Sequence, residues 1–217
     1  MIRPATSVPP LENGDRATRP EFERRYTHSP SDQKAELIEG TVYLMASPLR
    51  FQQHAEPHAN IIGWLWTYQV TIPNVRIGIE PTVRLDLENE PRPDAVLFWE
   101  ESAQGQAQLT ADDYIEGAPE LIVEIAASSS ALDLHGKKRA YQRNGVKEYL
   151  VWCIYENSLN WFSLEAGEYI LQQPDEKGII KSRVFPGLWL AVNELLAGNM
   201  SAVLETLNQG KQQITNE

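Results

Sequence analysis

The sequence has little cysteine: Cys153 is the only one among 217 residues. A single thiol excludes an internal disulfide and a cysteine-based zinc site, and it is typical of a reducing compartment. The longest mostly apolar segment, residues 61–72, is too short to span a bilayer. Residues 1–20 also lack the apolar core of a secretory signal. We therefore expect a cytoplasmic protein without a membrane anchor.

Positive charge is scarce as well. The chain carries 19 lysine and arginine residues against 30 acids, a formal net charge of −11. Proteins that hold nucleic acid through many phosphate contacts are usually basic, at least locally. The charge balance therefore counts against a simple DNA-coating role, but it is compatible with an enzyme whose acids hold metal ions.

The pattern of apolar residues predicts one domain around a central sheet. The predicted order is a hairpin with its turn at Glu39-Gly40, a helix, strands, a second helix, further strands and a last helix. This order is typical of an α/β fold (α+β mixed). We predict a flexible N-terminal arm over residues 1–20, either mobile or lying on the surface, the domain over 21–190, and a helical tail over 191–217.

An isolated acid interrupts the most apolar strand. Residues 121–127 read as a central strand because their apolar residues are continuous, yet Glu124 lies among them. Asp94 begins another predicted strand, and acids on neighbouring strands could share one Mg²⁺ ion. Alternatively, Glu124 faces solvent or pairs with a basic side chain. Under the metal hypothesis we expect Glu124 to have no protein partner in the metal-free state.

The segment after this strand reads as a helix, with serines at its start and Asn144-Gly145 at its end. Asp133, Lys137 and Tyr141 recur at a spacing of four, which places them on one face. A lysine beside two metal-binding acids could orient water or stabilise negative charge on a phosphoryl group. The alternative is a surface ion pair between Asp133 and Lys137, with Tyr141 packed beside it.

Two stretches, "PRPDAVLF" and "APELIVEIAASSSALDLHGKKRAYQRNGVKEYLVW", carry a resemblance to a known family. Together with "ELIEG", they resemble the Uma-two family of restriction endonucleases, within the PD-(D/E)XK nuclease superfamily. The resemblance runs from about Ala35 to Leu190. It implies a restriction-endonuclease-like core, with a central mixed β-sheet flanked by helices.

The resemblance also implies site residues. Asp94 and Glu124 would be catalytic acids that bind the metal, helped by the backbone oxygen of Ile125. The superfamily usually has a lysine where this chain has Ala126, and Lys137 matches a lysine supplied by the following helix instead. The residues expected to support the site are Glu36, Asp133 and Tyr141.

The implied function is hydrolysis of DNA by an endonuclease that uses Mg²⁺ or Mn²⁺, with a homodimer supplying two sites. The alternative is an inactive nuclease-like fold that binds a partner or regulates it; the net charge and Ala126 favour this alternative. A glycosidase with two catalytic acids is disfavoured, because neither the lysine nor the Pro-Asp context belongs to that chemistry.

Other residues have simpler interpretations. The basic side chains that follow Lys137 form the clearest candidate surface for nucleic acid. They are Lys138, Arg139, Arg143 and Lys147. His54 and His58 are spaced for a metal but lack a paired motif, so we expect a solvated helix start. The alternative is that His58 approaches the site as a phosphate contact. His135 should be exposed, most tryptophans should lie in the core, and Cys153 should be an inert buried thiol.

Overall fold

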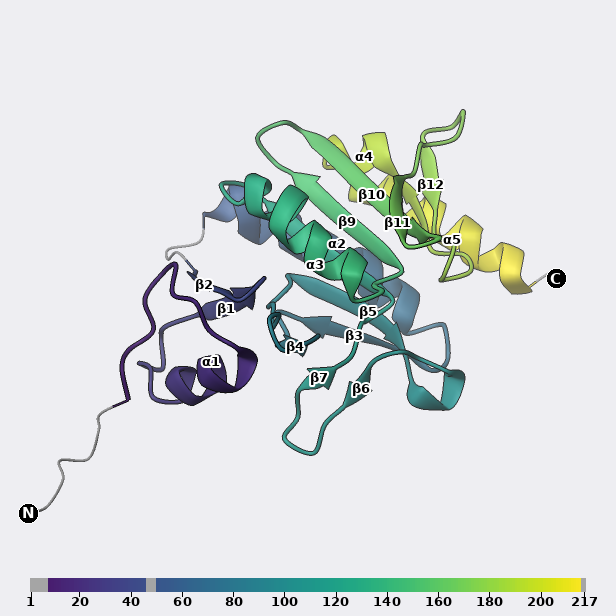
Figure 1. The fold of residues 1–217 in the computed structure, drawn as a ribbon. Coiled ribbons are helices and arrows are strands. Elements are labelled where there is room, and N and C mark those ends of the chain that lie inside the picture. The colour runs from purple at the N-terminus through teal and green to yellow at the C-terminus, as the bar shows by residue number, and fades with distance from the viewer. Residues whose placement is uncertain (1–7, 46–49, 216–217) are drawn as a thin grey trace, which may run out of the picture.

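The structure is a computed structural model that describes residues 8–45 and 50–215 of the chain. A six-stranded sheet forms its centre, with the strand order β11-β10-β9-β8-β5-β3 (Figure 1). β8 and β9 pair in parallel, and the other neighbouring strands pair antiparallel. The strands are β3 (Val75–Ile79), β5 (Ala95–Trp99), β8 (Leu121–Ala126), β9 (Glu148–Cys153), β10 (Ser158–Glu165) and β11 (Glu168–Leu171). The predicted mixed α/β fold is thereby confirmed.

Helices cover both faces of the sheet (Figure 1). One face packs against α2 (Glu56–Gln69), α4 (Val192–Leu196) and α5 (Met200–Thr215). The other face packs against α3 (Lys138–Arg143), which follows the π-helical turn η3 (Leu132–Lys137). A second π-helical turn, η1 (Phe51–Ala55), leads into α2.

The two faces of β8 show why Glu124 lies where it does. Leu121, Val123 and Ile125 belong to the core under α2, whereas Ile122 and Ala126 belong to the core under α3. Side chains alternate across a strand, so Glu124 has the parity of the α3 face. An acid on that face lies within reach of groups carried by η3 and α3.

The N-terminal segment lies on the predicted hairpin, formed by β1 (Ala35–Ile38) and β2 (Thr41–Leu44). Gly14 N donates to Val42 O at 2.8 Å, and Val42 N donates to Asp15 O at 2.8 Å. The helix α1 (Arg19–Tyr26) follows and buries Phe22. Of the two possibilities for residues 1–20, the contacts of residues 14–17 fit an extension on the surface; residues 1–7 lie outside the described residues.

Two small sheets complete the fold. β4 (Val83–Arg84), β7 (Ile115–Glu116) and β6 (Gln108–Leu109) form one, so the polar excursion over 101–117 contains two short strands. It also contains the 3₁₀ turn η2 (Glu101–Ala103). The second small sheet pairs β12 (Ile179–Lys181) with β13 (Trp189–Ala191).

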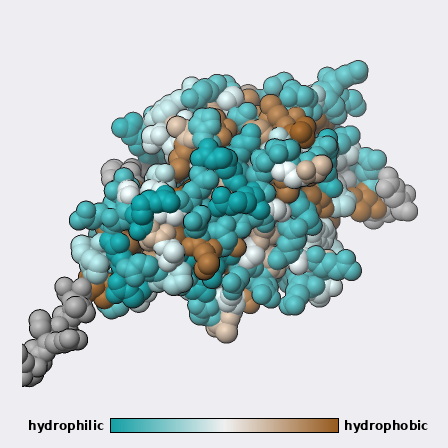
Figure 2. All heavy atoms as spheres, viewed as in Figure 1, coloured by the Kyte–Doolittle hydropathy of each residue, from teal (hydrophilic) through white to brown (hydrophobic). Residues whose placement is uncertain are grey.

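Hydrophilic side chains cover most of the face seen in Figure 2, with apolar ones scattered among them. Among the described residues, no helix combines the length and apolarity needed to cross a membrane.

The C-terminal helices are part of the core. Leu195, Val203 and Leu207 are at most 1% exposed and belong to the same core as α2. The boundary predicted at residue 190 therefore does not coincide with a break in packing. α5 approaches β13 closely at Gly210, where an added Cβ would overlap Gly187 O and lie 2.7 Å from Trp189 Cγ.

This close approach gives a stability prediction. Alanine usually stabilises a helix by about 1 kcal/mol relative to glycine. We expect Gly210→Ala to lower the free energy of unfolding, because the new Cβ meets the backbone oxygen of Gly187 and the packed ring of Trp189, which cannot move cheaply. Gly63→Ala, in α2 with nothing within 4 Å of the new Cβ, should raise it by about 0.5–1 kcal/mol. Urea unfolding measures both, and stabilisation by both variants would contradict the packing of α5.

Candidate active site

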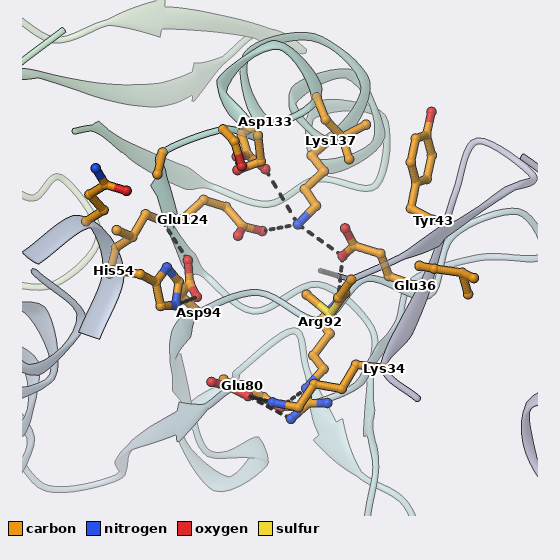
Figure 3. Close-up of a pocket in the computed structure, with 18 of the residues that line it drawn as sticks. Lys34, Glu36, Tyr43, His54, Glu80, Arg92, Asp94, Glu124, Asp133 and Lys137 are labelled. Atoms are coloured by element: carbon orange, nitrogen blue, oxygen red, sulfur yellow. Dashed lines mark hydrogen bonds and ion pairs between the residues drawn. The ribbon is translucent and has the colours of Figure 1, made fainter. Parts of the chain in front are cut away.

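A cavity of about 610 Å³ opens beside the ends of β5 and β8 (Figure 3). Its wall combines the hairpin β1–β2, the π-helical turns η1 and η3, and the sheet. The predicted site residues that line it are Glu36, Asp94, Glu124, Ile125, Asp133 and Lys137. These residues span a hundred positions of the chain, and the fold brings them to one place.

The two predicted metal-binding acids lie on neighbouring strands. Ala95 of β5 is the antiparallel partner of Val123 of β8. One position further along this pair of strands, Asp94 lies opposite Glu124. Asp94 Oδ2 accepts a hydrogen bond from Ile125 N at 2.6 Å, which ties the first acid to the second strand. The register therefore presents both carboxylates to one cavity.

Lys137 lies at the centre of a buried cluster of acids. Its Nζ atom is 3.0 Å from Glu36 Oε2, 3.1 Å from Glu124 Oε1 and 3.5 Å from Asp133 Oδ1 (Figure 3). The expectation that Glu124 lacks a protein partner without metal is therefore wrong. The neighbouring Lys138 points elsewhere, with its Nζ 3.8 Å from the centroid of the Phe162 ring.

Further hydrogen bonds fix the cluster. Tyr141 OH donates to Glu124 Oε1 at 2.8 Å, so Lys137 and Tyr141 contact the same carboxylate oxygen. Ser129 Oγ donates to Asp133 Oδ2 at 2.6 Å. Asp133, Lys137 and Tyr141 share the side of the helical segment that faces the sheet, even though the first two lie in the π-helical turn η3. Such turns occur frequently at functional sites.

The cluster carries more negative than positive charge. If all four acids ionise, Glu36, Asp94, Glu124 and Asp133 exceed the one charge of Lys137 by three. Glu124 is 4% exposed and Asp133 is 1% exposed, and these burials raise the pKa of both carboxyl groups.

The lysine responds to the same charges. Burial lowers the pKa of the Lys137 ammonium, but Glu124, Glu36 and Asp133 raise it by more, to well above its usual value. Lys137 is therefore a cation at neutral pH, whereas the acids around it are incompletely compensated.

The two histidines lie beside Asp94 and not at the solvated helix start that the sequence favoured. His54 Nε2 lies 3.2 Å from Asp94 Oδ1, and His58 Nε2 lies 2.9 Å from Asp94 O. The spacing of four residues was the available signal, but nothing in the sequence indicated that this helix start faces Asp94. A hydrogen bond with Asp94 raises the pKa of His54, against the effect of its partial burial.

The predicted basic surface lies outside the residues that line the cavity. Arg139 pairs with Glu39 at 2.7 Å, Arg143 lies 3.5 Å from Asp86, and Lys147 lies 3.8 Å from Glu120. Acids thus offset much of its charge, and a nucleic-acid role for these residues stays a prediction.

Three basic side chains that the sequence did not indicate line the cavity itself. They are Lys34, Arg50 and Arg92. Lys34 and Arg92 share Glu80, at 3.0 and 2.7 Å, on the side of the cavity opposite η3 (Figure 3). Arg92 N also donates to Glu36 Oε2 at 3.2 Å, which links this side to the lysine cluster.

Comparisons with known proteins show the family and the fold of the chain. The family model Uma2, described as "Putative restriction endonuclease", matches residues 19–193. A similar solved structure is described as a "putative nuclease belonging to DUF820" from Anabaena variabilis, with a TM-score of 0.61 and 14% sequence identity. The match covers 80% of this chain and 96% of that one. At this identity it shows the fold alone, and no curated protein matches the chain.

The buried cluster gives a second stability prediction. Lys137→Met removes the cation from among three buried carboxylates, so we expect the free energy of unfolding to fall by about 3–5 kcal/mol at pH 7.5. Lys138→Met is the matched control, because it loses only a contact with Phe162 worth about 0.5–1 kcal/mol.

The pH dependence follows from the raised pKa values of Glu124 and Asp133. A carboxyl whose folded pKa lies above its unfolded value stabilises the fold at low pH and loses that contribution as pH rises. The deficit of Lys137→Met should therefore be smaller at pH 5 than at pH 7.5, in urea unfolding at both values. Equal deficits for the two lysine variants would refute the cluster.

Proposed function

The chain belongs to the Uma2 family, and we propose that it is a nuclease that hydrolyses phosphodiester bonds of DNA with Mg²⁺ or Mn²⁺. The observation that carries the proposal is the cavity in which Asp94, Glu124 and Lys137 converge. Family membership supports the nuclease class, and the arrangement of these three groups supports metal-dependent hydrolysis as its chemistry.

The donor set fits a divalent cation. Asp94, Glu124 and the backbone oxygen of Ile125 offer the oxygen ligands that Mg²⁺ and Mn²⁺ prefer, and they would hold the ion. Glu124 contacts Lys137 and Tyr141 through Oε1, and neither of these contacts uses Oε2. The four acids at the cavity outnumber Lys137, and a divalent cation would favour their ionised forms against the burial that raises the pKa of Glu124 and Asp133. When bound, such an ion lowers the pKa of water and neutralises phosphate charge.

Lys137 would act as a fixed positive charge. Its pKa is raised well above the usual value, so it does not serve as a general base at neutral pH. An ammonium has three donors, and the neighbouring carboxylates hold them in place near the cavity. We propose that this charge orients the attacking water or stabilises the negative charge that develops on the phosphoryl group.

The supporting residues position these groups. Tyr141 holds the Glu124 carboxylate in one orientation through its hydroxyl. Glu36 links Lys137 to the backbone of Arg92, and Asp133 restrains the lysine from the other side. Because several contacts already hold these groups in place, little free energy is needed to reorganise them during the reaction.

DNA is the proposed substrate because of the family to which the chain belongs. Lys34, Arg50 and Arg92 in the cavity wall offer phosphate contacts within an otherwise acidic protein. We also propose that the protein works as a cytoplasmic homodimer, since cutting both strands of a duplex needs two sites. Analytical ultracentrifugation tests the dimer.

The second candidate is an inactive nuclease-like fold that binds a partner. Ala126 occupies the position where the superfamily usually has its lysine, and the cations of the predicted basic surface are paired with acids. Both observations favour this candidate, and the activity measurement separates the two.

We expect the purified protein to cleave DNA in Mg²⁺ or Mn²⁺ and to stop when a chelator is added. Glu124→Gln should lower the rate by about 100-fold or more, the loss expected when one preorganised electrostatic contact is removed. Gel assays with plasmid, single-stranded DNA and RNA substrates measure this rate and identify the polymer.

Glu205→Gln, an exposed residue of α5, is the control and should leave the rate unchanged. Calorimetry with Mn²⁺ on the same variants shows whether a lower rate is caused by loss of metal binding or by loss of hydrolysis at an occupied site. If the folded wild type neither cleaves DNA nor binds Mn²⁺, the nuclease proposal is wrong and the partner-binding candidate replaces it.

A further inference from the structure

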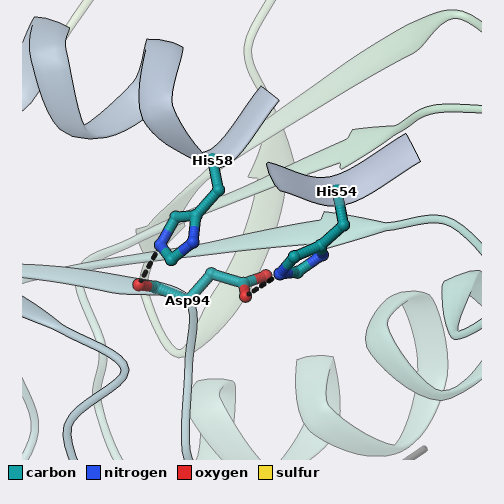
Figure 4. A group of neighbouring side chains, drawn as sticks. All are labelled: His54, His58 and Asp94. Atoms are coloured by element: carbon teal, nitrogen blue, oxygen red, sulfur yellow. Dashed lines mark hydrogen bonds and ion pairs between the residues drawn. The ribbon is translucent and has the colours of Figure 1, made fainter. Parts of the chain in front are cut away.

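His54 and His58 flank Asp94 on the side of the site formed by η1 and α2 (Figure 4). One potential ligand atom from each of the three residues lies within 4.8 Å of the others. The centroids of the two imidazole rings are 5.5 Å apart. All three residues are half-buried, so the group is both sheltered and accessible.

Local structure explains why the histidines face the same way. His54 lies in the π-helical turn η1, and His58 lies in the first turn of α2. Residues four apart project from one side of a helix, and Figure 4 shows both rings next to Asp94. The sheet therefore supplies a carboxylate between two imidazoles that the helix supplies.

The distance between His54 and Asp94 suits two ligands of one ion. Two ligands each about 2.1 Å from a metal lie about 3.0–3.4 Å apart at octahedral or tetrahedral angles. The distance from His54 Nε2 to Asp94 Oδ1 is 3.2 Å, within this range. Asp94 can serve here while it stays hydrogen-bonded to β8, because Ile125 N donates to its other oxygen, Oδ2.

His58 is also arranged as metal-binding histidines usually are. Such residues commonly donate their second ring N–H to a backbone carbonyl or a carboxylate, which fixes the tautomer. When His58 donates from Nε2 to Asp94 O, at 2.9 Å, its Nδ1 carries the lone pair that a metal requires.

We propose that His54, His58 and Asp94 form a second metal site, which binds a transition ion such as Zn²⁺ and shares Asp94 with the acid cluster. Imidazole ligands suit Zn²⁺, Ni²⁺ and Cu²⁺, whereas Mg²⁺ prefers oxygen ligands. The site would therefore bind an ion different from the one proposed for Asp94 and Glu124. It does not depend on nuclease activity, and binding alone can test it.

The competing account is a structural pair, in which protonated His54 neutralises Asp94 and His58 bonds to the backbone. The test is calorimetric titration of the tag-free, full-length protein with Zn²⁺. We expect His54→Gln and His58→Gln each to lower Zn²⁺ affinity by about 10-fold or more. Even the loss of a residue that only supports a ligand lowers metal affinity by about 10–100-fold.

The chain provides matched controls. His28→Gln and His135→Gln remove exposed histidines and should leave Zn²⁺ affinity unchanged. Glu124→Gln should also leave it unchanged, although it impairs the proposed hydrolytic site, so the two proposals can fail separately. Thermal melting of each variant confirms that it is folded.

A spectroscopic measurement identifies the ligand atoms directly. Pulsed electron paramagnetic resonance with Cu²⁺ at one equivalent should detect nitrogen coupling from imidazole, and His28→Gln/His135→Gln should retain it. The proposal is overturned if the wild type binds no Zn²⁺, if the double variant His54→Gln/His58→Gln binds it equally well, or if binding is lost only in Glu124→Gln.

Discussion

The ammonium of Lys137, enclosed by the carboxylates of Glu36, Glu124 and Asp133, is the interaction on which the rest of the site depends. Each acid comes from a different element: the hairpin, the central sheet and the π-helical turn η3. Charges this deeply buried are costly unless they are paired, so the three elements must meet at the lysine. The same contacts that hold these elements together also leave an acidic cavity beside Asp94.

Asp94 connects the two halves of the cavity. Its Oδ2 atom is bound to the backbone of β8, and its Oδ1 atom faces His54. A change of Asp94 itself would therefore alter both the acid cluster and the histidine pair, because both include this carboxylate. Both π-helical turns in the described part of the chain, η1 and η3, contribute side chains to the cavity. A π turn adds a residue to a helix and redirects side chains, which is how irregular helices come to serve sites.

The sequence allowed the fold class, the hairpin, the strand that contains Glu124 and the spacing of Lys137 to be predicted, because these follow from local patterns of two or four residues. It did not allow the contacts within the cluster to be predicted, since Tyr141 reaches Glu124, and Glu36 reaches Lys137, from segments that only tertiary packing brings together. The position of the histidines beside Asp94 could not be predicted for the same reason: a spacing of four is visible in the sequence, but the strand facing it is not. The charge offsets at Arg139 and Arg143 likewise come from Glu39 and Asp86, which lie far away in the sequence.

The central claim is that the cavity beside Lys137 binds a divalent cation through Asp94 and Glu124. A crystal of the protein grown with Mn²⁺, measured for anomalous scattering, tests this most directly. The account predicts an anomalous peak about 2.2 Å from oxygens of Asp94 and Glu124, with Lys137 still in contact with its acids. Peaks confined to surface carboxylates, with the cavity holding only water at saturating Mn²⁺, would contradict it.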